Sequence, residues 1–261
     1  MTLNYKSKRN PNKIYPYPWI LSSIIMSLYV WSLPILSYLF DQNKNKYLCN
    51  TLVICSDNTS FYNKTGSLYG CGCGQGIFGQ SVCPVCDYGY TISSYIATAP
   101  ATGLMACVSA FPSAAIWLFG TGSNRLYYEC RKTIPIFLIL LAKSTIISFQ
   151  VCFFIFLFAT DCIFPHLHDI SVSLFCLFGI IHYCLIAYIY QHYYDDKRGS
   201  KYIINLCLIS MFSFCLFILT GHIYDTQQIY LFKYFPWAFE CLGITTSFSI
   251  APIMIWYEYI H

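Results

Sequence analysis

The sequence predicts an all-α integral membrane protein, a six-transmembrane-helix bundle with a cysteine-rich lumenal loop. Of its 261 residues, 57% are hydrophobic and only 10% are charged, whereas an average soluble domain has about 25% charged residues. Several apolar runs reach the roughly 20 residues that a helix needs to cross the hydrocarbon core. The basic residues fall in short clusters between these runs. Together these features exclude an ordinary soluble domain.

Six apolar stretches are long enough to span the membrane. They are far longer than a barrel strand, and backbone groups in lipid must bond within their own segment, so they are expected to be helices. The predicted spans are Trp19–Phe40, Ile96–Phe119, Pro135–Thr160, Ile170–Tyr190, Tyr202–Gly221 and Trp237–Tyr257. The first run is longer than the apolar part of a typical signal peptide, so we interpret it as a retained signal anchor.

The basic residues predict the orientation. Ten of them precede the first span or lie in the second–third and fourth–fifth connections, and four lie on the opposite side, at positions 44, 46, 64 and 233. Because basic residues gather on the cytosolic side, both termini are predicted to be cytosolic. The same clustering explains the net charge of +4 without a nucleic-acid partner.

The loop from 41 to 95 is predicted to be lumenal or extracellular. It holds two glycosylation acceptors, Asn58 in Asn-Thr-Ser and Asn63 in Asn-Lys-Thr. Both fall in the one long loop that the basic residues already place on that side. With no internal repeat, residues 1–261 are expected to form a single membrane domain.

Six of the fifteen cysteines fall within this loop: Cys49, Cys55, Cys71, Cys73, Cys83 and Cys86. An even number of cysteines in an oxidising compartment predicts up to three disulfides, whose pairing the sequence does not define. The alternative is a zinc site, since Cys71, Cys73, Cys83 and Cys86 have a spacing that can surround one ion. We favour disulfides and predict no metal, because zinc would leave two of the cysteines without a partner.

Lys143 and His182 lie within the third and fourth predicted spans, each near the membrane midplane. Ionisable residues at such depth are costly and are therefore candidates for function. A short connection makes these two helices antiparallel neighbours, so a hydrogen bond between the two side chains is one reading. The other is a lysine that extends toward an interface and a core histidine bonded to a backbone carbonyl.

A second group of acidic and imidazole side chains gathers at the predicted lumenal ends of the spans. Most of these residues are typical of an ordinary membrane–water interface. Glu240 differs, because it sits about one turn into the last span among apolar neighbours, where a carboxylate needs a partner or a polar pocket. We predict that Glu240 shares such a pocket with Asp87, His168 and Asp169, as a lipid- or ligand-binding site. The group is Asp87, Asp161, His166, His168, Asp169, His222, Asp225 and Glu240.

The familiar catalytic patterns are missing. The chain has no phosphate-binding Walker loop, no Gly-x-Ser-x-Gly elbow and no His-Glu-x-x-His pair. The sequence therefore predicts no catalytic residue and no cofactor, and it favours a protein that is not an enzyme.

Three local patterns resemble the family of the damage-regulated autophagy modulators (DRAM), the Frag and Sfk proteins and the amino-terminal domain of Cwh-type proteins. Pro84-Val85-Cys86-Asp87-Tyr88-Gly89 is similar to the family's Pro-x-Ile-Ser-Asp-x-Gly segment, with Cys86 in place of serine. His168-Asp169 opens a span as in the family's fourth span, and Glu240 matches an acidic residue near the start of its last span, with Glu258 at the exit. The cysteine- and glycine-rich tract from Cys71 to Cys86 departs from the family pattern.

This resemblance implies a function linked to lipids in a lysosomal, Golgi or plasma membrane, in autophagy, in remodelling of GPI-anchor lipids or in phosphoinositide control. The first expectation is a non-enzymatic membrane protein that binds or organises membrane lipids or a partner complex. The first alternative is a GPI-lipid-remodelling enzyme with His168 as general base and Asp169 or Glu240 as the group that orients it. The second is a channel or transporter that uses Lys143, His182 and Glu240.

Overall fold

The computed structural model describes residues 15–49, 91–96, 101–121, 134–159, 164–193, 196–227 and 234–260, and every regular element in these ranges is a helix. Six of the helices are long and apolar enough to cross a membrane, which confirms the predicted six-helix bundle. The elements are α1 (Tyr17–Cys49), α4 (Ile92–Tyr95), α5 (Ala101–Thr121), α7 (Ile136–Phe158), α8 (Pro165–Tyr193), α9 (Lys197–Gln227) and α10 (Phe235–Ile260).

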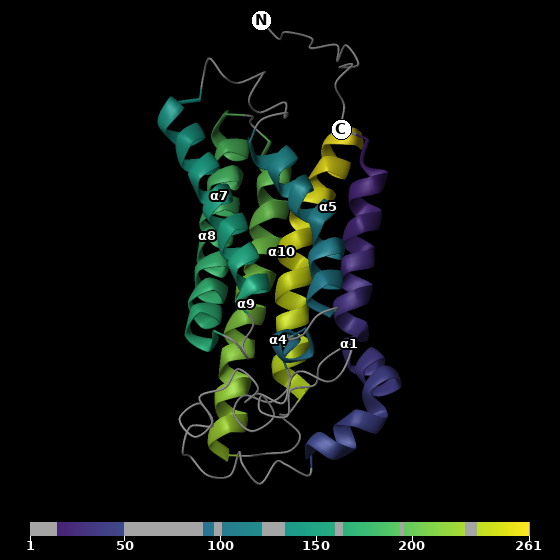
Figure 1. Cartoon of the computed structure of the whole chain (residues 1–261). Coiled ribbons are helices and arrows are strands. Elements are labelled where there is room, and N and C mark those ends of the chain that lie inside the picture. The colour runs from purple at the N-terminus through teal and green to yellow at the C-terminus, as the bar shows by residue number, and fades with distance from the viewer. Residues whose placement is uncertain are drawn as a thin grey trace, which may run out of the picture.

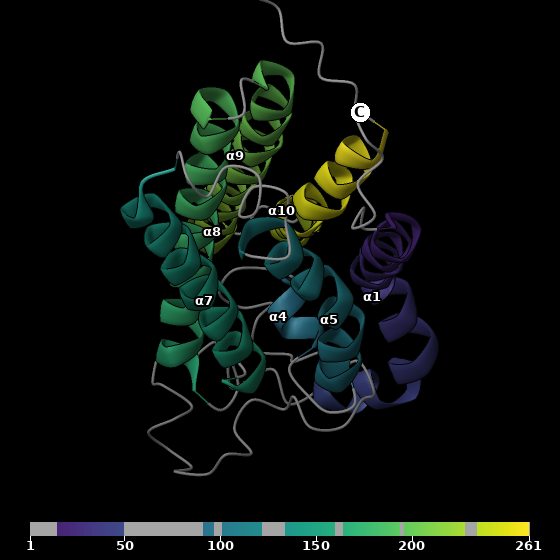
Figure 2. The same ribbon diagram turned by 90° about the horizontal axis from the view of Figure 1, so that it is seen from above.

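The helices run up and down as one bundle, and α1 begins at the same end at which α10 finishes (Figure 1). That arrangement follows from an even number of crossings. The short helix α4 lies at the opposite end, beside the start of α10 (Figures 1 and 2). We call this the α4 end of the bundle. It is the end that the basic residues predict to be lumenal.

Three helices, α1, α8 and α9, extend well past their predicted spans. α8 begins at Pro165 in place of Ile170 and ends at Tyr193. α1 continues to Cys49, so the first residues of the predicted loop 41–95 are helical. α9 begins at Lys197 and ends at Gln227. Asp196 starts α9 as its N-cap, because its carboxylate oxygen accepts a hydrogen bond from the Gly199 N–H at 2.8 Å. Hydropathy marks only the part of a helix that lies in lipid, so it does not reveal such polar turns.

α10 is the central helix. Buried residues make up 61% of the apolar stretch of α10, against 22% of that of α1 and 33–39% of those of the other four spans. It packs against α1, α5 and α9, and Figure 2 shows it between α9 and α1. Glu240 therefore lies on the most buried of the six long helices.

Small hydroxyl residues join α10 to its neighbours, as expected where apolar surface cannot drive helices together in lipid. Ser249 hydrogen-bonds Ser23 of α1 at 2.7 Å. Ser247 hydrogen-bonds Ser210 of α9 at 2.6 Å, and its carbonyl accepts the Tyr183 hydroxyl of α8 at 2.9 Å. These bonds fix the register of α10 against three other helices.

Phenylalanine rings fill the interior between α7, α8 and α10. Phe149, Phe153 and Phe156 lie on α7, Phe175 on α8 and Phe248 on α10, and each is at most 2% exposed. Neighbouring ring centroids are 4.8 to 6.1 Å apart, the spacing of favourable aromatic pairs. The bundle interior at this level is therefore a packed aromatic core.

Candidate functional site

The candidate site is built around α4, a single helical turn directly before α5. Ile92 and Tyr95 of this turn are at most 1% exposed, so its apolar side packs into the bundle. The Thr102 hydroxyl at the start of α5 donates to the Ile96 carbonyl and closes the connection. A helix this short does not stand alone in solution, so contacts from the other helices must hold it.

Glu240 supplies one of these contacts. It is the sixth residue of α10 and only 3% exposed, and its Oε2 accepts a hydrogen bond from the backbone N–H of Ile92 at 2.5 Å. This N–H lies in the first turn of α4, where a helix has no internal acceptor for it. The carboxyl group thus satisfies a buried backbone donor that would otherwise lack a partner.

His168 supplies the second contact. It lies in the first turn of α8 and is 4% exposed. Its Nδ1 is 2.7 Å from the Ala159 carbonyl oxygen, at the end of α7, and its Nε2 is 2.7 Å from the Ser93 hydroxyl. The Phe156 ring covers one side of the imidazole, with centroids 4.9 Å apart.

These contacts define the tautomer of His168. A carbonyl oxygen can only accept, so Nδ1 must carry a proton and donate to Ala159. In the neutral ring Nε2 is then an acceptor, and the Ser93 hydroxyl donates to it. Both imidazole nitrogens are used, one toward α7 and one toward α4.

Glu240 and His168 therefore hold consecutive residues of α4, Ile92 and Ser93, from two different helices. Segments that are 75 and 148 residues apart in the chain meet at this turn. We call the arrangement the α4 tether, meaning Glu240, His168, Ile92, Ser93 and the Ala159 carbonyl. It stabilises the chain at the point where the predicted lumenal loop ends and the second span begins.

The other two predicted members of the pocket lie elsewhere. Asp169 is exposed, because the residue after an inward-facing His168 points away from the bundle. Asp87 lies outside the described residues. The tether thus joins Glu240 to His168 through α4. A binding role for the four residues stays a prediction.

His182 makes its contacts with α7, the helix that the short connection predicts as its neighbour. Its ring is 1% exposed, and Nδ1 lies 3.2 Å from the Ala142 carbonyl and 3.3 Å from the Thr145 hydroxyl. The carbonyl contact is the one expected of a core histidine. Lys143, next to Ala142, is half-buried.

The remaining predicted sites fall mostly outside the described residues. Asn58, Asn63 and the loop cysteines from Cys55 to Cys86 do so, and Cys49 is the last residue of α1. The seven cysteines whose side chains the structure describes, all outside the predicted loop, are free thiols. Within the described ranges, no group of three histidine, cysteine or acidic side chains is placed to hold a metal ion.

Two members of the tether give no signal in the sequence. Ser93 is an ordinary serine in a Thr-Ile-Ser-Ser run, and the Ala159 carbonyl is a backbone group. Both become visible only when α4 is placed against α7 and α8.

The chain matches no family model, and no curated protein or solved structure matches it. Its function is accordingly inferred from the geometry of the α4 end.

Proposed function

We propose that the protein binds and organises membrane lipids at its predicted lumenal face without catalysing a reaction, and that the α4 tether holds the loop that meets the lipid headgroups. The observation that carries this proposal is that the two titratable side chains of the tether, Glu240 and His168, face the interior of the protein. Glu240 and His168 are almost fully buried, and both hydrogen-bond other groups of the chain. Such groups position a surface, which leaves recognition to the loop before α4.

The depth of the site supports a headgroup-level role. The rings of Trp31 and Trp237 meet near the tether, with centroids 5.4 Å apart, and Trp31 is 40% exposed. Trp237 precedes Glu240 by one helical turn. Because tryptophan prefers the boundary between hydrocarbon and headgroups, this pair is consistent with a tether at the level of the lipid headgroups.

The resemblance to DRAM, Frag and Sfk proteins supports the same proposal, since it implies a lipid-linked role in a lysosomal, Golgi or plasma membrane. The channel alternative has less support. Along α7, the rings of the aromatic core occupy positions between Thr145, at the level of His182, and Ala159, at the level of His168. A polar path from His182 to Glu240 would have to pass through these rings.

The test is to identify the lipids that stay bound to the purified protein, by native mass spectrometry. We expect the wild type to retain one lipid class above its share in the source membrane. Glu240→Leu removes the acceptor of the Ile92 N–H and should lose that lipid while eluting as the same species. Thr245→Val is the matched control, because the Thr245 hydroxyl lies on the same helix and donates to carbonyls of that helix, and it should retain the lipid. The proposal fails if the wild type enriches no lipid class or if Glu240→Leu retains it equally. If a protein co-elutes and no lipid is enriched, the protein organises a partner complex instead of lipids.

One observation favours a second candidate, a lipid-modifying enzyme of the GPI-remodelling kind. The Ser93 hydroxyl donates to His168 Nε2 at 2.7 Å while Nδ1 is oriented by an acceptor, which is the arrangement of an activated nucleophile and its base. In this enzyme mechanism, the acceptor that orients the His168 ring is the Ala159 carbonyl, and not Asp169 or Glu240.

A fluorophosphonate probe, which reacts with activated serines, separates the two candidates. The enzyme predicts a label on Ser93 that is lost in Ser93→Ala and His168→Gln and kept in Ser171→Ala. The lipid-organising function predicts that the wild type takes no more label than Ser93→Ala.

A further inference from the structure

Two cysteine thiols meet where α8 and α9 pack together. Cys184 of α8 and Cys207 of α9 are both free thiols, and their side chains hydrogen-bond one another. Neither residue belongs to the α4 tether. Because a cysteine sulfur is a nucleophile that can be oxidised, two thiols in contact can become joined to one another, which a thiol on its own cannot do.

The register of α8 against α9 explains why these two residues meet. α8 ends at Tyr193 and α9 begins at Lys197, so a short connection makes the two helices antiparallel neighbours. Cys184 lies nine residues before Tyr193, and Cys207 lies ten residues after Lys197. At 1.5 Å per residue, both are about 14–15 Å from the connection. The two thiols therefore share one level, inside the apolar spans of both helices.

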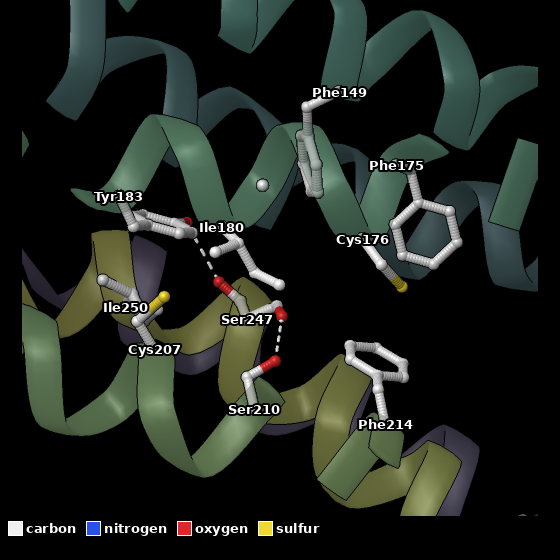
Figure 3. A pocket seen from close by; sticks show the side chains of 11 residues that line it. Phe149, Phe175, Cys176, Ile180, Tyr183, Cys207, Ser210, Phe214, Ser247 and Ile250 are labelled. Atoms are coloured by element: carbon white, nitrogen blue, oxygen red, sulfur yellow. Dashed lines mark hydrogen bonds between the residues drawn. The ribbon is translucent and has the colours of Figure 1, made fainter. Parts of the chain in front are cut away.

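The two thiols have different surroundings. Cys184 is exposed on α8, at a depth where the surrounding medium is lipid. Cys207 is 6% exposed and lines a narrow cleft inside the bundle together with Tyr183 and Ile250, which Figure 3 shows next to it. This cleft has room for about one water molecule. A reagent that comes from the membrane therefore meets Cys184 first.

The position of the pair restricts the kind of oxidant that can reach it. Hydrogen peroxide and glutathione disulfide are polar, and a polar molecule enters hydrocarbon only at a large cost in free energy. A lipid hydroperoxide carries its O–O group on an acyl chain and is already part of the membrane. The lipid-facing position of Cys184 therefore favours a lipid hydroperoxide as the oxidant.

We propose that Cys184 and Cys207 form a redox pair that reduces a lipid hydroperoxide and closes into a disulfide between α8 and α9. In the first step the Cys184 sulfur bonds to the terminal oxygen of the hydroperoxide and the O–O bond breaks. The Cys184 proton goes to the leaving oxygen, which gives a lipid alcohol and a sulfenic acid on Cys184. In the second step the Cys207 sulfur bonds to the Cys184 sulfur, the S–O bond breaks, and the hydroxyl leaves as water with the Cys207 proton. The two thiols together lose the two electrons that the peroxide gains.

This inference goes beyond the proposed function, because it concerns a reaction with an oxidised acyl chain and not the recognition of a headgroup. The thiol pair also lies apart from the α4 end. His168 is in the first turn of α8, whereas Cys184 is residue 20 of the 29 in that helix. At 1.5 Å per residue, the pair is about 24 Å from His168 along the helix. One hydroperoxide uses up the pair, so the reaction is stoichiometric.

The test uses the full protein in nanodiscs that contain phosphatidylcholine with a hydroperoxide on one acyl chain. Free thiols are then alkylated, and disulfides are mapped by mass spectrometry of unreduced peptides. We expect a bond between Cys184 and Cys207, with one hydroperoxide converted to the lipid alcohol for each bond formed. Nanodiscs of the same phosphatidylcholine without the peroxide group should give several-fold less of this bond.

Single variants assign the two steps. Cys207→Ser should leave Cys184 as a sulfenic acid, which dimedone labels, because the second thiol is missing. Cys184→Ser should leave Cys207 unlabelled, because Cys207 is buried. Cys215→Ser is the matched control, since Cys215 is an exposed cysteine on the same helix as Cys207, and it should not change the yield of the bond.

The wild type alone can overturn the inference, whatever the variants do. It is wrong if no bond forms between the two cysteines, or if the yield is the same without the peroxide group. A bond that forms with a membrane quinone and not with the hydroperoxide would also overturn it. Glu240→Leu should leave the yield unchanged, so failure here is distinguishable from failure of the proposed lipid-organising function.

Discussion

His168 is the residue on which the α4 end depends most closely. One nitrogen donates to the Ala159 carbonyl and the other accepts from Ser93, so the ring joins the end of α7 to α4. Buried polar atoms that lose a partner cost about 1–3 kcal/mol, whereas a typical bond contributes only about 1 kcal/mol net. Removing either partner of His168 should therefore lower the free energy of unfolding by more than the net contribution of the hydrogen bond itself.

This reasoning predicts the effect of Ser93→Ala. The substitution leaves His168 Nε2 buried without a donor, so we expect the free energy of unfolding to fall by about 1–3 kcal/mol. Ser171→Ala is the matched control, because that buried hydroxyl returns to the His168 carbonyl within its own helix, and it should cost less than about 1 kcal/mol. Equilibrium unfolding in detergent measures both. Equal losses in the two variants would contradict the role given to Ser93.

At the scale of single elements, hydropathy predicted the six long helices because each needs about 20 apolar residues to cross the hydrocarbon core. The turns of α1 and α9 beyond the membrane were not predicted, since polar residues there carry no apolar signal. α4 was not predicted either. Four residues are too few to show a helical period, and the turn exists because Glu240 and His168 hold it from helices far along the chain.

The contact between α9 and α10 gives a second element-scale prediction. Gly243→Ala places a methyl group 3.0 Å from the Phe214 ring, so the ring or the two helices must move apart, and we expect a loss of about 1–3 kcal/mol in the free energy of unfolding. Gly103→Ala is the control. A Cβ there meets nothing within 4 Å, and alanine is the better helix former by about 0.5–1 kcal/mol. Thermal unfolding should therefore shift down for the first variant and not for the second.

At the scale of the whole molecule, the structure places the start of α1 and the end of α10 on the same side of the bundle (Figure 1). Which side faces the cytosol still rests on the ten-to-four distribution of basic residues. The sequence could predict that Glu240 needs a partner, because its depth follows from its place in the span. It could not identify Ile92 or Ser93 as partners, since backbone groups and single serines have no pattern.

The orientation predicts glycosylation of the loop. Asn58 and Asn63 should both carry glycans if residues 41–95 lie in the lumen, so glycosidase treatment should increase the gel mobility of the mature protein. Asn58→Gln combined with Asn63→Gln should remove that shift. A wild-type protein whose mobility does not change on treatment would contradict the predicted orientation.

The α4 tether is tested most directly by hydrogen exchange of residues 91–96 in the full protein. The Ile92 amide should exchange slowly in the wild type and in Asp169→Asn. Glu240→Leu removes its acceptor, and His168→Phe releases Ser93, so each should speed exchange of this segment by about tenfold to a hundredfold. Protection that is unchanged in both variants would contradict the conclusion that Glu240 and His168 hold α4.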